Sequence, residues 1–320
     1  AAVPKFAELV HQVFQESVDT SRANSTSIGP NADPLRTVDH IPLAAKVLGE
    51  FEILRKLGQG GFGEVFEARH LSRGDRVALK TLPTQLEDAQ RTADNVGRLR
   101  QFKNEFRALA DINHRHLVGL QTLEEDGGQY FFTMDLVDGT DFLNHVRSDN
   151  QLDEQRLRSV LSQLVSGVIA LHGHQIIHRD LKPNNVMVDR DGQVKILDFG
   201  LVVDLAQNIG MTAAGLFDGT PAYAAPEQAV GERSFASDWY AVGVMLYEAL
   251  VGRWPHGGQT GAEVLRKKQD KGSDSIIGEA HVPDDLAKPA CGCSPAIRTS
   301  GQRRRRSRRL FLPRLRSSPR

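Results

Sequence analysis

The chain has 320 residues, of which 40% are hydrophobic, enough for one two-part domain with a proper core and additional tails. It contains no apolar run near the ~20 residues that span a bilayer, and its two cysteines, Cys291 and Cys293, match neither a disulfide framework nor a zinc pattern. The formal charge is zero, but ten arginines from Arg298 onward leave residues 1–297 with 30 basic against 40 acidic residues, which argues against nucleic-acid binding.

The N-terminal segment is expected to lie outside the main domain. Residues 3–16 space apolar side chains at helical intervals and predict a short amphipathic helix, which docks on its own chain or on a partner. Residues 21–34 are polar with Pro and Gly and predict a linker. With neither a signal peptide nor an initiator methionine, we interpret the chain as a processed or partial product, and the sparse cysteines favour a reducing cytoplasm.

A glycine-rich stretch opens the main domain. Residues 51–70, FEILRKLGQGGFGEVFEARH, carry G-x-G-x-x-G between strand-like runs. Alone, this pattern is weak and also fits a dinucleotide-binding turn. Here a strand rather than a helix follows the glycines, and a further strand, VALK (77–80), comes next. This order favours a hairpin in which glycines let backbone N–H groups approach phosphates.

Several regular elements follow in order. Residues 98–110 predict a helix, residues 114–120 lead into a strand, and residues 128–142 predict a strand followed by a hinge. Residues 153–175 predict a long amphipathic helix that belongs to the core and carries no chemistry.

Residues 177–200, IHRDLKPNNVMVDRDGQVKILDFG, concentrate the chemistry. The apolar runs 186–188 and 194–197 flank the turn 189–192 and predict a β-hairpin. This hairpin brings Asn185 and Asp198 together as oxygen ligands suited to Mg²⁺. Asp180 can accept a proton from a hydroxyl nucleophile, and Lys182 can neutralise a transferring phosphoryl group. A surface hairpin with scattered charge is the alternative for any one of these residues alone.

The spacing H-R-D-L-K-P-x-N followed by D-F-G, together with the glycine-rich hairpin and GTPAYAAPE at 219–227, resembles the Hanks-type serine/threonine protein kinases, most closely their bacterial branch. The resemblance covers about residues 51–288. It implies an α+β, two-lobed protein-kinase fold, with a small β-rich lobe over about 48–134 and a larger, mainly helical lobe over about 138–288. Residues 1–47 precede the kinase domain, and residues 289–320 follow it.

The resemblance also implies an ATP site with Mg²⁺, or Mn²⁺, held by Asn185 and Asp198. Lys80 would bind the α- and β-phosphates, and Glu105, if it is not a solvated helix carboxylate, would pair with Lys80. Met134 would be the gatekeeper. Asp141 would lie near the ribose or the substrate. The residues expected around the nucleotide are Leu57, Gly58, Gln59, Gly60, Gly61, Phe62, Gly63, Val65, Ala78, Lys80, Met134, Asp135, Val137 and Met187.

After D-F-G (Phe199, Gly200), the resemblance implies an activation segment. Thr212 is its candidate autophosphorylation site, with Arg179 as the phosphate partner; an unmodified loop threonine is the competing interpretation. Thr220 would bond Asp180 and Lys182. His178, Asp238 and Glu227 would have structural roles. Asp238 would bind the backbone at His178–Arg179, and Glu227 would pair with an arginine near the end of the domain.

The ending departs from the family. Residues 289–320 lack acids and helical periodicity and contain no D-P-x-x-R-P turn. One interpretation is a basic low-complexity tail for nucleic acid or an acidic partner. We favour an out-of-frame translation, because shifted codons permit R-D-P and R-P in order; re-sequencing the coding DNA decides this. As written, we expect a marginally folded chain that could be inactive.

The sequence therefore predicts a serine/threonine protein kinase that acts on proteins and on itself, with no membrane segment in this chain and no nucleic-acid partner. The alternative is a pseudokinase or truncated module that binds nucleotide or protein without catalysis. Intact Lys80, Asp180 and Asp198 disfavour that alternative. A small-molecule kinase of the same fold is disfavoured by the G-T-P-x-Y-x-A-P-E segment.

Overall fold

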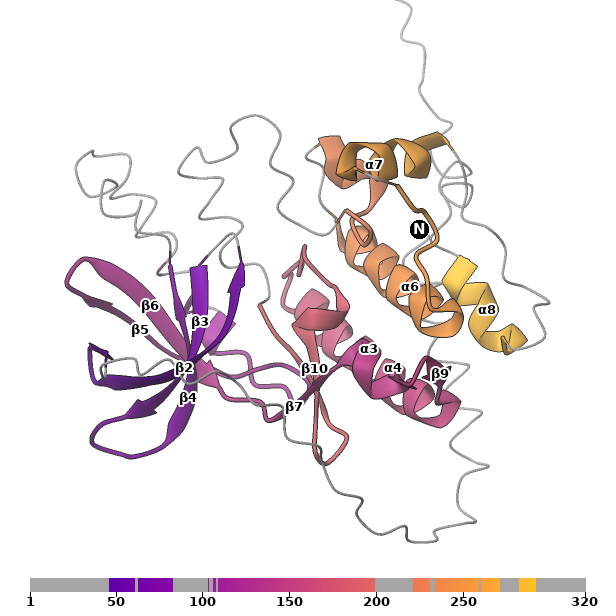
Figure 1. The fold of residues 1–320 in the computed structure, drawn as a ribbon. Helices are drawn as coiled ribbons and strands as arrows, with labels where there is room; N and C mark the ends of the chain where they lie inside the picture. The colour runs from indigo at the N-terminus through magenta and orange to yellow at the C-terminus, as the bar shows by residue number, and fades with distance from the viewer. Residues whose placement is uncertain are drawn as a thin grey trace, which may run out of the picture.

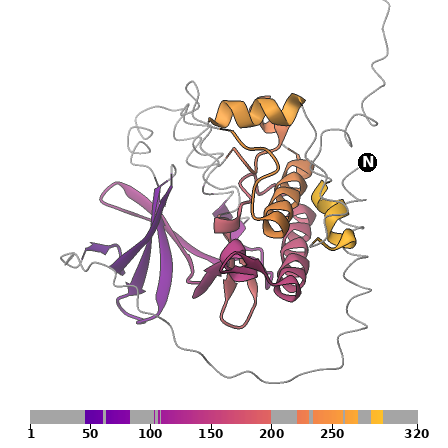
Figure 2. The same cartoon turned by 45° about the vertical axis from the view of Figure 1, so that its right-hand side comes forward.

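The computed structural model describes residues 46–60, 63–82, 103, 106–107, 109–198, 221–230, 234–258, 260–270 and 282–291. These residues form a β-rich lobe and a mainly helical lobe that lie side by side in two views (Figures 1 and 2). This α+β arrangement agrees with the predicted fold class. The predicted helix over 3–16, the linker 21–34 and the tail from residue 292 lie outside the described residues.

The small lobe is an antiparallel sheet in the order β1-β2-β3-β4-β6-β5. Its strands pair mostly with their sequence neighbours, and the described residues at positions 103–110 that precede β5 are helical. The strands are β1 (Val47–Leu48), β2 (Phe51–Gly60), β3 (Gly63–His70), β4 (Arg76–Thr81), β5 (Leu120–Asp126) and β6 (Gln129–Asp135).

The side chains of β4 face alternate sides of the sheet, and this determines the side on which Lys80 lies. Val77 and Leu79 are buried in a cluster on one face of the sheet, together with Phe51 and Phe131. Successive side chains of a strand face opposite sides, so Ala78 and Lys80 face the other side, where Ala78 joins the main core that continues into the helical lobe. The strand pattern therefore places a lysine on the side of the sheet that faces the other lobe.

The large lobe is built on helices and short strand pairs. Strands β7, β10 and β11 form a three-stranded antiparallel sheet in the order β11-β10-β7, and β8 pairs with β9. The elements are β7 (Gly139–Asp141), α3 (Phe142–Val146), β8 (Arg147–Ser148), β9 (Gln151–Leu152), α4 (Glu154–Gly173), β10 (Val186–Asp189), β11 (Val194–Ile196), α6 (Phe235–Val251), α7 (Gly261–Asp270) and α8 (Asp284–Cys291).

Helices α4 and α6 differ in how much of their surface they bury. Asp153 caps α4 by accepting a hydrogen bond from the Arg156 N–H at 2.9 Å, and one apolar stripe of α4 is buried. Helix α6 is buried on all sides over 237–250 and ends at Gly252, whose φ of +74° suits glycine. Helix α6 packs against both α4 and α8 and belongs to the core of this lobe.

The hairpin predicted over 186–197 is confirmed as β10 and β11. Its turn is held by the Asp189 carboxylate, which accepts hydrogen bonds from the N–H groups of Asp191 at 2.9 Å and Gln193 at 2.8 Å. At the open end, the Leu197 N–H donates to the Asn185 carbonyl at 2.8 Å. The residues on either side of the hairpin, Asn185 and Asp198, are thus held at the same end.

Gly139 on β7 offers a test of this sheet. A Cβ at Gly139 would lie 2.0 Å from the Val188 carbonyl oxygen on β10. Because that contact is with backbone, Gly139→Ala should lower the free energy of unfolding by about 1–3 kcal/mol in urea titrations. Gly173→Ala, at the end of α4 where an added Cβ meets no atom within 4 Å, is the matched control and should be neutral or slightly stabilising. Equal effects of the two changes would contradict the β7–β10 packing.

Helix α8 continues to Cys291, three residues past the predicted end of the domain. Leu286, Ala287 and Ala290 are buried in the core that α6 shares. Asp285 receives two hydrogen bonds from the Arg158 guanidinium on α4, at 2.6 and 3.0 Å, and this pair lowers the pKa of the Asp285 carboxyl. Residues 284–291 therefore cover part of the apolar surface of the large lobe.

Two histidines beside β11 make stability depend on pH. Burial lowers the pKa of His114 and of His116, and the nearby Arg115 and Lys195 lower both further. In the unfolded chain histidine titrates near pH ~6.5, so the unfolded state binds protons first as the pH falls. The stability that these groups confer is therefore present above pH ~6.5 and lost as the pH falls from there through the lower folded pKa values.

We expect the urea midpoint to decrease between pH 7.5 and pH 5.5, and His116→Gln to flatten that dependence because glutamine does not titrate. A midpoint that stays constant, or a slope unchanged in His116→Gln, would contradict the burial of these rings in their neutral form.

Candidate active site

Asp180, Lys182 and Asn185 form one hydrogen-bonded cluster just before β10. The Lys182 ammonium lies 2.7 Å from Oδ2 of Asp180. The Asn185 amide nitrogen donates to the Asp180 carbonyl at 2.7 Å and to Oδ2 of Asp180 at 3.1 Å. A 3₁₀ turn over Pro183–Asn185 sets this spacing, because the Asn185 N–H bonds back to the Lys182 carbonyl at 3.0 Å. The same carboxylate oxygen, Oδ2 of Asp180, thus accepts from a cation and from an amide.

The loop before this cluster is anchored on α6. Asp238, which is buried, accepts hydrogen bonds from the N–H groups of His178 at 2.8 Å and Arg179 at 2.9 Å, the contact that the sequence analysis expected. His172 on α4 contacts the same carboxylate at 2.9 Å. The His178 Nε2 lies 2.8 Å from the Leu197 carbonyl, so this nitrogen carries the proton and donates. The loop is fixed to α6 and to the end of the β10–β11 hairpin.

Lys80 joins the two lobes at this site. Its Nζ lies 2.7 Å from Oδ1 of Asp198, and the lysine side chain is only 9% exposed. Asp198 adopts a φ of +55°, and Arg179 a φ of +74°, conformations that are uncommon for residues other than glycine. Such backbone persists where surrounding contacts hold it, and it clusters at functional sites. A buried lysine and a carboxylate from opposite lobes therefore meet next to the Asp180 cluster.

The oxygen donors here fit a magnesium ion. The amide nitrogen of Asn185 is committed to Asp180, which leaves its Oδ1 as the atom that can bind a metal ion. Among the described residues, no group of three or more His, Cys, Asp and Glu side chains gathers as a metal cage. Mg²⁺ commonly binds through one or two protein oxygens together with substrate phosphates and water, so a pair of donors suffices.

The predicted nucleotide residues that the structure describes on the sheet lie on β2, β3, β4 and β6. In the β2–β3 hairpin Gly58 pairs with Val65, and a Cβ on Gly58 would meet no atom within 4 Å. Gly63 differs, because its φ is +127° and an added Cβ would lie 1.9 Å from the Thr81 carbonyl oxygen, so packing alone demands glycine there. Gln59 and Gly60 belong to β2, and Leu57 is partly exposed on the same strand.

Further predicted nucleotide residues lie at the end of β6, just after it, and on β10. Met134, which is buried, pairs with Ala78 across the sheet, and Val65 pairs with Lys80. The Asp135 carboxylate is committed to the segment around the start of β5, because it accepts hydrogen bonds from the Gly119 N–H and the Gln121 side chain, both at 3.1 Å. Val137 follows, partly buried against the core, and Met187 lies on β10.

Asp141 has a local role. It caps α3 by accepting a hydrogen bond from the Asn144 N–H at 3.0 Å. Its Oδ2 also accepts a hydrogen bond from the Asn144 side chain at 2.5 Å, so each carboxylate oxygen of Asp141 has a hydrogen-bond partner within α3.

Several predicted site residues lie outside the part of the chain that the structure describes: Gly61, Phe62, Glu105, Phe199, Gly200, Thr212 and Thr220. The expected pairing of Lys80 with Glu105 thus stays a prediction. Glu227 is described, and its Oε1 accepts a hydrogen bond from Ser237 Oγ at 3.0 Å.

Sequence reasoning missed two supports of the site, His172 and Gln228. The Gln228 side chain accepts from the Ala225 N–H at 2.7 Å and donates to the Arg179 carbonyl at 3.1 Å, which connects the segment after residue 220 to the catalytic loop. No local pattern marks either residue, since Arg179 lies 49 positions from Gln228, and Asp238 lies 66 positions from His172.

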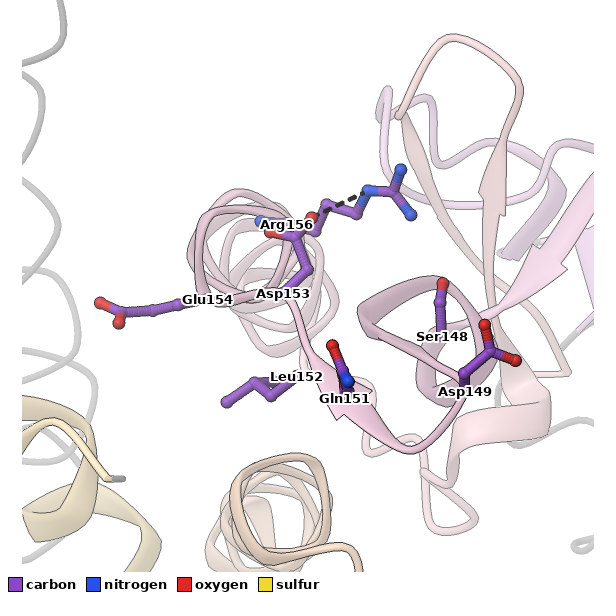
Figure 3. Close-up of a pocket in the computed structure, with 7 residues that line it drawn as sticks. All are labelled: Ser148, Asp149, Gln151, Leu152, Asp153, Glu154 and Arg156. Carbon is purple, nitrogen blue, oxygen red and sulfur yellow. Dashed lines mark hydrogen bonds and ion pairs between the residues drawn. The ribbon is translucent and has the colours of Figure 1, made fainter. Parts of the chain in front are cut away.

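A separate hollow lies on the large lobe beside β8, β9 and the first turn of α4 (Figure 3). Its lining includes Asp149, Asp153 and Arg156, and Figure 3 shows Arg156 folded back toward Asp153, at 3.3 Å. None of the predicted site residues borders this hollow. This hollow is therefore separate from the predicted site at the Asp180 cluster and Lys80.

Comparison with known proteins shows which family the chain belongs to. Residues 51–290 match the protein kinase domain family. The chain belongs to that family. The kinase match begins with β2 and ends within α8, so it covers both lobes and leaves only β1 of the elements described above outside it.

Individual relatives are bacterial and eukaryotic serine/threonine kinases. The chain is 35% identical over 273 residues to serine/threonine-protein kinase pkn3 of Myxococcus xanthus, which covers 82% of this chain and 47% of that protein. It is 31% identical over 239 residues to the probable serine/threonine-protein kinase PknB of Lactococcus lactis, covering 74% of this chain and 37% of the relative. The chain thus spans half or less of these kinases. Within its described residues, no helix has the length and apolar character needed to cross a bilayer.

Proposed function

We propose that this kinase chain transfers the γ-phosphoryl group of Mg-ATP to serine or threonine hydroxyls of proteins, including its own. The observation that carries the proposal is the cluster of Asp180, Lys182 and Asn185, joined through the hairpin end to the Lys80–Asp198 ion pair. A base, two cations and two oxygen ligands at one cleft are the parts that phosphoryl transfer needs.

Nucleotide binding is assigned to the small lobe and the hinge. The glycines of the β2–β3 hairpin present backbone N–H groups to the phosphates, and Lys80 contacts the α- and β-phosphates. Val65, Ala78, Met134 and Met187 offer apolar contact to the adenine. The Asp135 carbonyl and the Val137 N–H would hydrogen-bond its edge, because the other polar groups of Asp135 are committed to residues 119–121.

Asp180 positions the acceptor. The hydroxyl oxygen of the substrate attacks the γ-phosphorus, the bond from phosphorus to the β–γ bridging oxygen breaks, and ADP leaves. The proton of the hydroxyl passes to the Asp180 carboxylate, and Lys182, 2.7 Å from that carboxylate, offsets charge on the transferring oxygens. Magnesium or manganese, held by Asn185 and Asp198, would neutralise phosphate charge.

The segment that begins at Thr220 is proposed as the polypeptide platform. Residues 221–224 form a turn that is tied to Arg179 through Ala225 and Gln228. Its position beside the catalytic loop supports a role in holding the acceptor chain near Asp180. Thr212 is proposed as the autophosphorylation site, with Arg179 as the group that binds the phosphate. A cytoplasmic location for the kinase domain belongs to the same proposal.

Identification of the phosphorylated residue tests this function. The chain is incubated with γ-labelled ATP, Mg²⁺ and dephosphorylated casein, and acid hydrolysates are separated into phosphoserine, phosphothreonine and phosphotyrosine. We expect label on serine and threonine, in casein and in the chain itself, and none when EDTA removes the metal. Label on tyrosine alone would overturn the acceptor assignment, and nucleotide binding without transfer would favour the non-catalytic module.

A further inference from the structure

Lys268, on α7, is buried completely, and nothing in the reaction described above uses it. Its ammonium donates three hydrogen bonds to carbonyl oxygens of one turn: Pro221 at 2.7 Å, Ala222 at 2.5 Å and Ala224 at 2.8 Å. The ring of Tyr240, on α6, lies 5.2 Å from the same nitrogen. A lysine ammonium has three N–H donors, and here all three are matched by carbonyls, which offsets the cost of burying the charge.

The rest of the inner face of α7 supports the same contact. Gly261, Val264 and Lys268 are spaced three and four residues apart and therefore share one face of the helix. A Cβ on Gly261 would come within 2.7 Å of Cγ of Pro221, so the first turn of α7 approaches the turn as closely as glycine permits. Helix α7 thus holds residues 221–224 from both of its ends.

The opposite side of this turn is bound to the catalytic loop. Ala225 donates to Gln228 at 2.7 Å, and Gln228 donates to the carbonyl of Arg179 at 3.1 Å. Arg179 immediately precedes Asp180. The turn therefore lies between Lys268 and the proposed catalytic base, with hydrogen bonds on both sides.

We propose that Lys268 is a positioning residue that sets the 221–224 turn, and hence the acceptor polypeptide, relative to Asp180. The inference rests on the proposed kinase function and assigns α7 a part in acceptor binding. Lys268 touches neither nucleotide nor acceptor, and it acts through the three carbonyls that it binds.

The expected result is a selective loss of acceptor binding. Methionine has nearly the length of lysine but no donors, so Lys268→Met leaves three carbonyls without this partner and allows the turn to move. We expect the KM for casein to rise roughly tenfold or more, as for loss of a buried charge-assisted hydrogen-bond set. The KM for Mg-ATP should stay within about twofold, since Lys268 is remote from the Lys80–Asp198 side of the cleft.

Two further variants sharpen the test. Lys267→Met removes the neighbouring lysine of α7, which is 43% exposed and pairs with Glu263, and should leave both KM values unchanged. Gly261→Ala keeps Lys268 but forces α7 away from Pro221, so it should raise the KM for casein in the same selective way. Gly261→Ala also serves if Lys268→Met does not fold.

Steady-state rates at varied casein and varied Mg-ATP separate the outcomes. A rise in the KM for casein alone, in Lys268→Met and in Gly261→Ala but not in Lys267→Met, supports the proposal. An unchanged KM for casein overturns the proposal. A lower kcat together with a rise in both KM values and a lower melting temperature also overturns it, because Lys268 is then a purely stabilising residue. If the wild-type chain itself transfers no phosphate, the proposed function fails instead, which is a distinguishable result.

Discussion

Replacing Asp180 by asparagine should lower the kcat for phosphate transfer by about 10²–10⁴-fold, the usual contribution of a positioned acid or base. The change preserves size and can keep the 3.1 Å contact with Asn185, but it removes the carboxylate that accepts the hydroxyl proton. It also removes the negative partner of Lys182, 2.7 Å away. The KM for Mg-ATP should change little, because Asp180 is assigned to the acceptor rather than to the nucleotide.

Asp191→Asn is the matched control for Asp180→Asn. Asp191 lies in the exposed turn of the β10–β11 hairpin, eleven positions along the chain, and receives the same change of charge. Initial rates with casein and γ-labelled ATP would be measured for both variants, with melting curves to show that both are folded. An Asp180→Asn chain that keeps half of the wild-type rate, or an Asp191→Asn chain that loses as much, would refute the assignment.

The second large effect is expected at Lys80. Lys80→Met removes a buried cation that lies 2.7 Å from Asp198 and faces the cleft from β4. The phosphates lose a charged donor in a site of low exposure, so kcat/KM for Mg-ATP should fall by roughly 10²-fold or more. The substitution also removes the ion pair with Asp198, which should weaken the interaction between the two lobes.

Lys267→Met, the same substitution on the outer face of α7, is the control for Lys80→Met. Steady-state kinetics at varied Mg-ATP, together with equilibrium binding of the nucleotide, give the two readouts. Nucleotide binding and turnover that both survive in Lys80→Met would show that another residue holds the phosphates.

Local patterns were sufficient for much of the fold. The strand predicted over 77–80 is present within β4, and the turn residues 189–192 predicted the β10–β11 hairpin. The long helix expected over 153–175 is present as α4. These features follow from periodicity and turn chemistry within one short stretch of chain.

Local sequence patterns did not predict the contacts between segments that are distant in the chain. The resemblance to kinases predicted that Asp238 binds the backbone at His178 and Arg179. No local pattern indicated that His172 contacts the same carboxylate. No sequence pattern distinguishes Lys268 from the other lysines of the chain. Only the folded structure shows that its ammonium donates hydrogen bonds to three carbonyls. Such partners depend on tertiary packing, which periodicity does not encode.

The end of the domain was also beyond sequence reasoning. A proline at position 289 and the basic residues beyond it gave no helical periodicity, yet α8 continues to Cys291 and buries Leu286 and Ala290. The expected loss of stability from the altered ending stays a prediction, as does the shifted reading frame. Covering of the large lobe by α8 reduces the apolar surface that such an ending would leave exposed.

Single-turnover transfer by the wild-type chain is the most direct test of the central claim. The chain, in excess, is loaded with γ-labelled Mg-ATP, mixed with casein, and quenched over time. We predict that the label moves from nucleotide to serine and threonine, with first-order kinetics that vanish in EDTA. Nucleotide that stays intact on a folded, nucleotide-loaded chain would contradict phosphoryl transfer and leave a binding module.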